Sequence, residues 1–507
     1  MTTLDDITRF LRAAAGGRAE VIETHISRVV IGPARAWKIK KPVSFSYLDF
    51  STREKRAAAA QTELTLNRRT APTLYIGLRR VTQEKDGRLE FDGAGETIET
   101  IVEMRRFDQA DLFDAMAQRG ALTPALMTRL TERVADFHRA AAADFLYGGA
   151  AGIERVLQID VPALASSGLA TPQRIAALDA AFRSRLKALA PLLDARRAVG
   201  KVRRCHGDLT LRNICLFEGE PTPFDCIEFD AALGTIDVLY DLAFLLMDLI
   251  HRGLRDLANL VFNRYLDAAD ETDGLPALPF FMALRASIRA HVAATQARGA
   301  DASSAGALRA EAQAYFDLAE RLLDRGEAIL VAVGGFSGSG KSTFAAALAP
   351  SLGPAPGARI LSSDRIRKRL HGAAATQKLP PAAYAPDVSE RVYRIMREQA
   401  SRVLDLGYAV VADAVFDRPH LAVAVERCAH DAGAAFAGFW LSGARDRLAA
   451  RISARRDDPS DATVAVLDAQ MLVGRQPSGW RPLDASMPIG RVSALAEAAL
   501  PGRNVRT

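Results

Sequence analysis

The chain has 507 residues, 49% of them hydrophobic and 25% charged, which predicts two or three globular domains. Its formal charge of +6 comes from arginine, because only ten of its 66 basic residues are lysine. No basic run with interleaved aromatic residues is present, so we expect no nucleic-acid partner. Residues 1–17 carry early acids and no long apolar core, and no other segment is long and apolar enough for a bilayer, so we expect no membrane partner. The four cysteines lack metal-ligand spacing, which indicates reduced thiols in a cytoplasmic protein.

The first part of the chain, residues 1–107, is predicted to be a small lobe rich in strands. Its strand-like runs lie at 27–32, 36–41, 74–81 and 99–107, and a helical pattern covers about 51–69. Residues 108–325 show mostly helical patterns and form a predicted larger lobe. The two together predict an α+β domain of two lobes with a cleft between them.

The remainder, residues 326–507, is predicted to be an α/β domain. The segment AILVAVGG (328–335) is a continuous apolar run, as expected for a buried parallel strand. Further strand patterns alternate with helical ones, at 358–364, 407–416 and 434–442. That alternation indicates a parallel sheet.

A cluster of polar side chains lies in the segment HGDLTLRN (206–213) of the predicted helical lobe. Asp208 and Asn213 have the spacing of the kinase catalytic loop, in which the aspartate positions or deprotonates the attacking hydroxyl and the asparagine binds metal. Asp225 follows on a short predicted strand and supplies a second carboxylate. The spacing therefore predicts a magnesium–ATP site.

A second phosphate site is predicted at GFSGSGKST (335–343), which matches G-x-x-x-x-G-K-[ST] between a predicted strand and a helix. The backbone N–H groups of such a loop form an anion nest at a helix N-terminus. Lys341 would reach the β- and γ-phosphates of a nucleotide, and Ser342 its magnesium. The residues expected to contact the nucleotide are Gly335, Ser337, Gly338, Ser339, Gly340, Lys341, Ser342 and Thr343.

The segments HGDLTLRN, FDCIEFD (224–230) and IDVLYDLA (236–243) resemble the aminoglycoside phosphotransferase and choline-kinase-like group of protein-kinase relatives. The resemblance covers about residues 20–320. It implies that Asp208 is the catalytic base and that Asn213 and Asp225 bind magnesium, with Glu228 as the alternative to Asp225.

The same resemblance implies a strand lysine that holds the phosphates and pairs with a helix glutamate. Lys38, in AWKIKK, fits this pattern best, and Lys40 on the same strand face is the alternative. The partner would be Glu63, or else Glu54.

Two further assignments follow from this resemblance. The segment VEMRRF (102–107) resembles the kinase hinge, where backbone atoms of Glu103 and Arg105 would meet the adenine. Asp237 and Asp241 would be structural residues that fix the catalytic loop and open the following helix.

The C-terminal segment, over about residues 327–475, resembles P-loop small-molecule kinases of the gluconate-kinase-like and zeta-toxin-like kind, among the AAA family ATPases. In such kinases an aspartate in the place of Asp364 orients the acceptor hydroxyl, and Asp413 would be the acid near magnesium. The segment 447–462 resembles their arginine-bearing lid, with Arg451 and Arg455 expected on one helix face.

We therefore expect a kinase-like domain followed by a P-loop domain, with ATP and Mg²⁺ bound in both. The expected reaction is transfer of the γ-phosphate of ATP to a hydroxyl of a small sugar- or polyol-like molecule. In one alternative a single domain is catalytic and the other is a nucleotide-binding regulatory module. In another the protein is an aminoglycoside-modifying resistance kinase. The sequence leaves the acceptor and the oligomeric state open.

Overall fold

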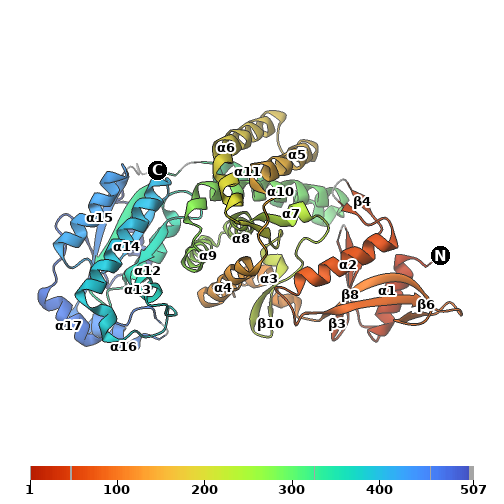
Figure 1. Cartoon of the computed structure of the whole chain (residues 1–507), viewed down its shortest axis with the longest axis horizontal. Helices are drawn as coiled ribbons and strands as arrows, with labels where there is room; N and C mark the ends of the chain where they lie inside the picture. The colour runs from red at the N-terminus through yellow and green to blue at the C-terminus, as the bar shows by residue number, and fades with distance from the viewer. Residues whose placement is uncertain (1, 25, 46–47, 325, 457, 502–507) are drawn as a thin grey trace. The chain divides into compact units, whose positions relative to one another are not determined.

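The computed structural model describes residues 2–501 except 25, 46–47, 325 and 457. The chain forms two compact units, one of Met1–Asp248 and Arg285–Ala312 and the other of Leu249–Leu284 and Gln313–Thr507. Figure 1 traces the chain and labels its elements. The second unit thus includes residues that precede the P-loop by more than fifty positions along the chain.

The first unit begins with a six-stranded antiparallel sheet in the order β1-β2-β3-β8-β6-β7. Its strands are β1 (Glu20–Glu23), β2 (Ser27–Ile31), β3 (Arg35–Lys40), β6 (Tyr75–Gln83), β7 (Leu89–Phe91) and β8 (Glu96–Arg105). Helix α2 (Arg53–Asn67) starts at Thr52, whose hydroxyl accepts the backbone N–H of Lys55. Figure 1 shows α2 lying along this sheet, against β6 and β8.

Helices dominate the rest of the first unit. They include α3 (Phe113–Gln118), α4 (Pro124–Ala140), α5 (Gly149–Ser167), α6 (Pro172–Ala198), α8 (Val238–His251) as far as Asp248, and α10 (Leu278–Gly299) from Arg285 onward. Helix α8 is apolar all round and almost wholly buried, as expected for a central helix. Two short antiparallel ladders frame the loop 205–213: β9 (Val202–Arg204) with β12 (Thr235–Asp237), and β10 (Ile214–Phe217) with β11 (Glu220–Pro223).

The second unit contains a five-stranded parallel sheet in the order β14-β15-β13-β16-β17. The strands are β13 (Ile329–Gly335), β14 (Arg359–Ser362), β15 (Val410–Asp413), β16 (Ala435–Ser442) and β17 (Arg481–Asp484). The predicted fold class is therefore confirmed for both regions. The sequence did not predict β17, whose segment RPLD lacks an apolar run.

Side-chain alternation fixes the two faces of this sheet. Val331 and Val333 of β13 share a core with Phe344 of α12 (Lys341–Leu348) and Val492 of α18 (Ile489–Glu497). Helices α14 (Pro386–Asp405) and α15 (Pro419–Asp431) pack on each other and on the sheet. The loop after β13 lies at the carboxyl edge of this parallel sheet. Because β15 and β14 lie on one side of β13 in the sheet and β16 and β17 on the other, this is the point where the strand order reverses and a crevice forms.

Helix α9 (Arg255–Ala268) packs on β14 within the second unit. The side chain of Asn259 donates to the carbonyl of Ala358, 3.1 Å away, and Asp267 pairs with Arg359 at 2.6 Å. Of the helices in the described part of the chain, none has both the length and the hydropathy to cross a membrane.

Candidate functional site

The loop 206–213 of the first unit is held by one buried carboxylate, that of Asp241 on α8. It accepts the backbone N–H of His206 at 3.0 Å and that of Gly207 at 2.7 Å. The ring of His138 lies 3.0 Å from the same carboxylate. Burial is the largest influence and opposes the charge, but the interactions with His138, His206 and Arg285 together outweigh it and lower the pKa of Asp241 to about 2. The predicted structural role of Asp241 is confirmed.

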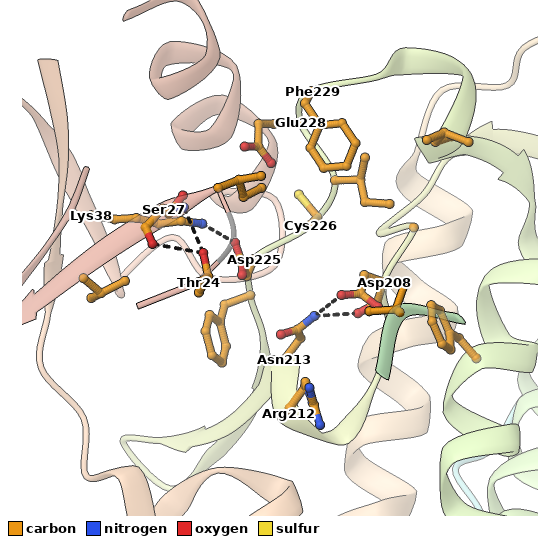
Figure 2. Close-up of a pocket in the computed structure, with 18 of the residues that line it drawn as sticks. Thr24, Ser27, Lys38, Asp208, Arg212, Asn213, Asp225, Cys226, Glu228 and Phe229 are labelled. Carbon is orange, nitrogen blue, oxygen red and sulfur yellow. Dashed lines mark hydrogen bonds and ion pairs between the residues drawn. The ribbon is translucent and has the colours of Figure 1, made fainter. Parts of the chain in front are cut away.

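This anchored loop brings Asp208 and Asn213 together. The Asn213 side-chain amide donates to the backbone oxygen of Asp208 at 2.9 Å and to its carboxylate at 2.7 Å. Figure 2 shows both bonds, with the amide oxygen of Asn213 turned away from Asp208, on the side of Asp225. The donor set on that side consists of an amide oxygen and a carboxylate, which suits a hard cation such as Mg²⁺.

The strand lysines pair with a helix glutamate, as the sequence predicts. Lys38 Nζ lies 2.9 Å from one oxygen of Glu63, and Lys40 Nζ lies 2.7 Å from the other. Burial raises the pKa of Glu63, but the two ammonium groups outweigh it and lower the pKa to about 2. The alternative partner, Glu54, is exposed at the start of α2.

The two candidate metal carboxylates differ in their surroundings. Asp225 is bonded to Lys38, and 39% of its side chain is exposed (Figure 2). Glu228 pairs with Lys40 and is only 4% exposed. Asp225 adopts a φ of 60°, a conformation that non-glycine residues seldom take and that is found at functional sites. Both residues line the cavity, but the carboxylate of Asp225 is the more accessible of the two.

These residues line a cavity of about 600 Å³ in the first unit. Lys38, Asp208, Asn213 and Asp225 all face it. The two predicted hinge residues, Arg105 and Glu103, lie in different surroundings. Arg105 lines the cavity, but its backbone N–H is already bonded to the carbonyl oxygen of Leu74.

Glu103 is not brought to the site. Its backbone lies in register with β3 on one side and β6 on the other, and its carboxylate accepts a hydrogen bond from Trp37 Nε1 at 3.3 Å. A residue paired on both edges of its strand has its backbone committed to the sheet. The role of Glu103 therefore stays a prediction that the geometry does not support.

The second unit builds its loop 335–342 between β13 and α12. Gly338 has a φ of +83°, and a Cβ there would lie 2.5 Å from the carbonyl of Leu448, so only glycine fits. Ser337 N–H donates to the side chain of Gln470 at 2.8 Å. Lys341 Nζ donates to the carbonyl of Phe336 at 3.1 Å, across the loop.

Three charged groups meet at the carboxyl edge of the sheet. Ser342 Oγ donates to Asp413 at 2.7 Å, and Asp413 lies in register with β13 and β14. Burial raises the pKa of Asp413 and of Asp364, although Lys341 opposes it in both. Burial also lowers the pKa of Lys341. Such mutually desolvated groups are typical of functional sites.

One prediction about the lid is wrong. Helix α16 (Arg445–Ala454) ends before Arg455, whose backbone is extended, so Arg451 and Arg455 do not share a helix face. The sequence that follows the helix contains two aspartates, which are weak helix formers, and then Pro459, which cannot continue a helix. Arg451 donates to the carbonyl of Ala485 at 2.8 Å, and Arg455 keeps a buried guanidinium nitrogen without a hydrogen bond in the described residues.

The sequence missed several residues that shape the two sites. Tyr75 accepts the N–H of Asp225 at 3.3 Å, and Asn67 accepts that of Cys226 at 2.9 Å. Gln470, on α17 (Val464–Val473), reaches the phosphate loop of the second unit. None of these side chains stands in a motif, because each comes from an element distant along the chain.

Two families match the chain, one in each region. Residues 94–280 match the phosphotransferase enzyme family, and residues 330–477 match the AAA domain family. The chain is 29% identical over 467 residues to uncharacterized proteins of Mycobacterium bovis and Mycobacterium tuberculosis, covering 90% of this chain and 90% of each relative.

Solved structures resemble each region separately. A gluconokinase from Sinorhizobium meliloti 1021 has 22% identity and a TM-score of 0.25, covering 35% of this chain and 94% of that one. A choline/ethanolamine kinase family protein from Mesorhizobium loti has 14% identity and a TM-score of 0.38, covering 63% of this chain and 94% of that one. The chain thus carries a segment similar to the phosphotransferase enzyme family followed by a segment similar to the AAA domain family, and the two matches together support a phosphotransferase.

Proposed function

We propose that both units are kinases that transfer the γ-phosphate of ATP to a hydroxyl of a small sugar- or polyol-like molecule, each at its own site. One observation carries the proposal. Each unit holds an aspartate without a basic partner at ion-pair distance in the described residues: Asp208 in the first and Asp364 in the second. Lys38, Asn213 and Asp225 line the same cavity as Asp208, and Lys341 lies near enough to Asp364 to act on its pKa. These are the parts that phosphoryl transfer requires.

In the first unit Asp208 is the hydroxyl-positioning base. The Asn213 amide holds one of its carboxylate oxygens, which leaves the other for the acceptor. The acceptor oxygen forms a bond to the γ-phosphorus, the bond to the departing ADP oxygen breaks, and the hydroxyl proton passes to Asp208. Lys38 would hold the phosphates. Asn213 and Asp225 would hold Mg²⁺, which when bound neutralises charge on the phosphates.

In the second unit the backbone N–H groups of the loop 335–342 would hold the phosphates together with Lys341. Ser342 and Asp413 would bind magnesium in this site, because a hydrogen bond already holds their oxygens together. Asp364 would receive the acceptor proton, and its pKa, which burial raises, is shifted in the direction that suits a base. Arg451 and Arg455 would face the charge that develops in the transition state.

The test is turnover of ATP by the full chain with a panel of sugars and polyols. Asp208→Asn and Lys341→Ala should each lose one activity and retain the other. Loss of a base or a phosphate lysine lowers a rate by about 100- to 10,000-fold, so the double variant should retain no measurable turnover.

The matched controls are Asp136→Asn and Arg427→Ala, which alter exposed side chains of the first and the second unit. Both should turn over ATP like the wild type. If Lys341→Ala abolishes all turnover and Asp208→Asn changes nothing, the first unit is a regulatory nucleotide-binding module and the proposal is wrong. Turnover that survives in the double variant would also contradict it.

A further inference from the structure

The cavity of the first unit continues past Asp208 into its helical part, where it contains charged groups that phosphate transfer does not use. Asp160 on α5 and Arg285 on α10 both line it. Their side chains are buried, with 1% and 5% of the residue surface exposed. Charged side chains are this buried only where something compensates the charge.

Arg285 is compensated only in part by the described residues, because the charge of Asp241 acts on it from beyond ion-pair distance. Its Nε donates to the backbone oxygen of Tyr240 at 3.2 Å, and its guanidinium stacks on the rings of Tyr240 at 3.8 Å and Phe244 at 4.5 Å. It forms no ion pair with a described carboxylate, and its Nη2 is buried without a hydrogen bond. A buried guanidinium with a free edge on a cavity is a site for a carboxylate or a phosphate.

Asp160 offers a different contact. One carboxylate oxygen accepts the hydroxyl of Ser287 at 2.5 Å. The other lies 3.3 Å from the ring of His291 and has no hydrogen bond in the described residues. Burial raises the pKa of Asp160 to about 7. A carboxyl that is protonated part of the time both donates to and accepts from a hydroxyl.

The charges at this end do not favour a polycation. The buried charged residues that line it are Arg285, Arg289 and Asp160, and Arg285 has no carboxylate at ion-pair distance in the described residues. His291 adds no negative charge, and burial lowers its pKa to about 4, so it is neutral at pH 7. An amine-rich antibiotic would meet two buried guanidinium groups here, which argues against the aminoglycoside alternative.

We propose that this end of the cavity is the acceptor subsite, in which Arg285 binds a carboxylate or phosphate of the acceptor and Asp160 binds one of its hydroxyls. The acceptor is thus a small hydroxylated acid. This inference rests on the proposed function of the first unit, because Asp208 in the same cavity would then activate another hydroxyl of that molecule.

The experiment is calorimetric titration of the full chain, saturated with Mg²⁺ and a non-hydrolysable ATP analogue so that the phosphate sites are filled. Four probes share one ring and differ in charge: glucose, glucosamine, glucuronate and glucose 6-phosphate. At least one of the two anionic probes should bind tenfold or more tightly than glucose, and glucosamine should bind no better than glucose. The stronger of the two anions identifies carboxylate or phosphate as the recognised group.

Arg285→Met should abolish the anion preference, and Arg285→Lys, which keeps the charge, should retain it with weaker binding. Arg298→Met, an exposed change on the same helix, should bind like the wild type. Equal binding of all four probes, binding of none, or a preference that survives in Arg285→Met would overturn the proposal. The binding readout is independent of catalysis. If the chain prefers anions but Asp208→Asn loses no turnover, the proposed function of the first unit is wrong, whereas the anion-binding subsite is still supported.

Discussion

Replacing Asp160 by asparagine should make the first unit more stable at neutral pH than the wild type. Burial raises the pKa of this carboxyl from its ordinary value of 3.8 to about 7. Between these values the unfolded chain has lost the proton and the folded chain has kept it, so the unfolded state binds fewer protons and stability falls as pH rises. The difference between these two pKa values corresponds to a loss of about 4 kcal/mol of unfolding free energy in total, of which about 2.5 kcal/mol falls between pH 5 and pH 7.5.

Asparagine has nearly the shape of the protonated acid and does not ionise, so it removes this penalty. Wild type and Asp160→Asn should therefore be similarly stable near pH 4. As the pH rises to 7.5, the free energy of unfolding of the variant should exceed that of the wild type by a growing amount. The assay is urea unfolding at a series of pH values, followed by hydrogen exchange of peptides from α5 and α10. These peptides report on the first unit separately from the second.

Only the difference between the two proteins is informative, because other groups titrate over the same range. His291 beside Asp160 acts in the opposite direction. Burial lowers its pKa to about 4, so the unfolded chain takes up the proton more readily than the folded chain. The stability that the neutral ring contributes is therefore lost as pH falls. Asp136→Asn, at a side chain that is 70% exposed, should give a nearly constant difference from wild type. A constant difference for Asp160→Asn as well would refute the argument that Asp160 is buried as an acid.

Three further outcomes are expected. Asp225→Asn should weaken magnesium-dependent nucleotide binding in the first unit by about tenfold or more in calorimetric titrations, because under the proposed function it removes a carboxylate that would bind magnesium. Gly338→Ala should abolish nucleotide binding in the second unit, because the Cβ of the new alanine would lie 2.5 Å from the carbonyl oxygen of Leu448. This is measured in a chain that also carries Asp225→Asn, so that binding in the first unit is weakened. Asp267→Asn should destabilise the second unit by about 3 kcal/mol in urea unfolding, because it leaves the guanidinium of Arg359 buried without its carboxylate.

Matched changes separate these effects from general damage. Gly372 also has a positive φ but no atom within 4 Å of a Cβ, so Gly372→Ala should preserve nucleotide binding. Asp256 is exposed on the same helix as Asp267, and Asp256→Asn should change stability by less than about 0.5 kcal/mol. If Gly338→Ala binds nucleotide normally, the loop does not hold the phosphates. If Asp256→Asn is as destabilising as Asp267→Asn, the pairing with Arg359 is not the cause.

Local sequence determined which side chains and backbone groups meet in each of the two loops. Asp208 and Asn213 meet within one short loop, and the loop 335–342 closes on its own helix, so spacing along the chain was enough to predict both. The strand patterns likewise predicted a parallel sheet in the second unit, because buried parallel strands are apolar on both faces. The Lys38–Glu63 pair was predicted through the family resemblance, which supplied the distance between elements that no local pattern contains.

Tertiary structure decided the rest. Asp160 and Arg285 lie on helices more than a hundred residues apart, and neither belongs to a motif, so only folding brings them to one cavity. The same holds for α9, which packs on β14 through Asn259 and Asp267. Side chains of this kind act through burial and proximity, and these arise from packing between distant segments. A linear pattern carries no information on which distant charge will be desolvated beside which other.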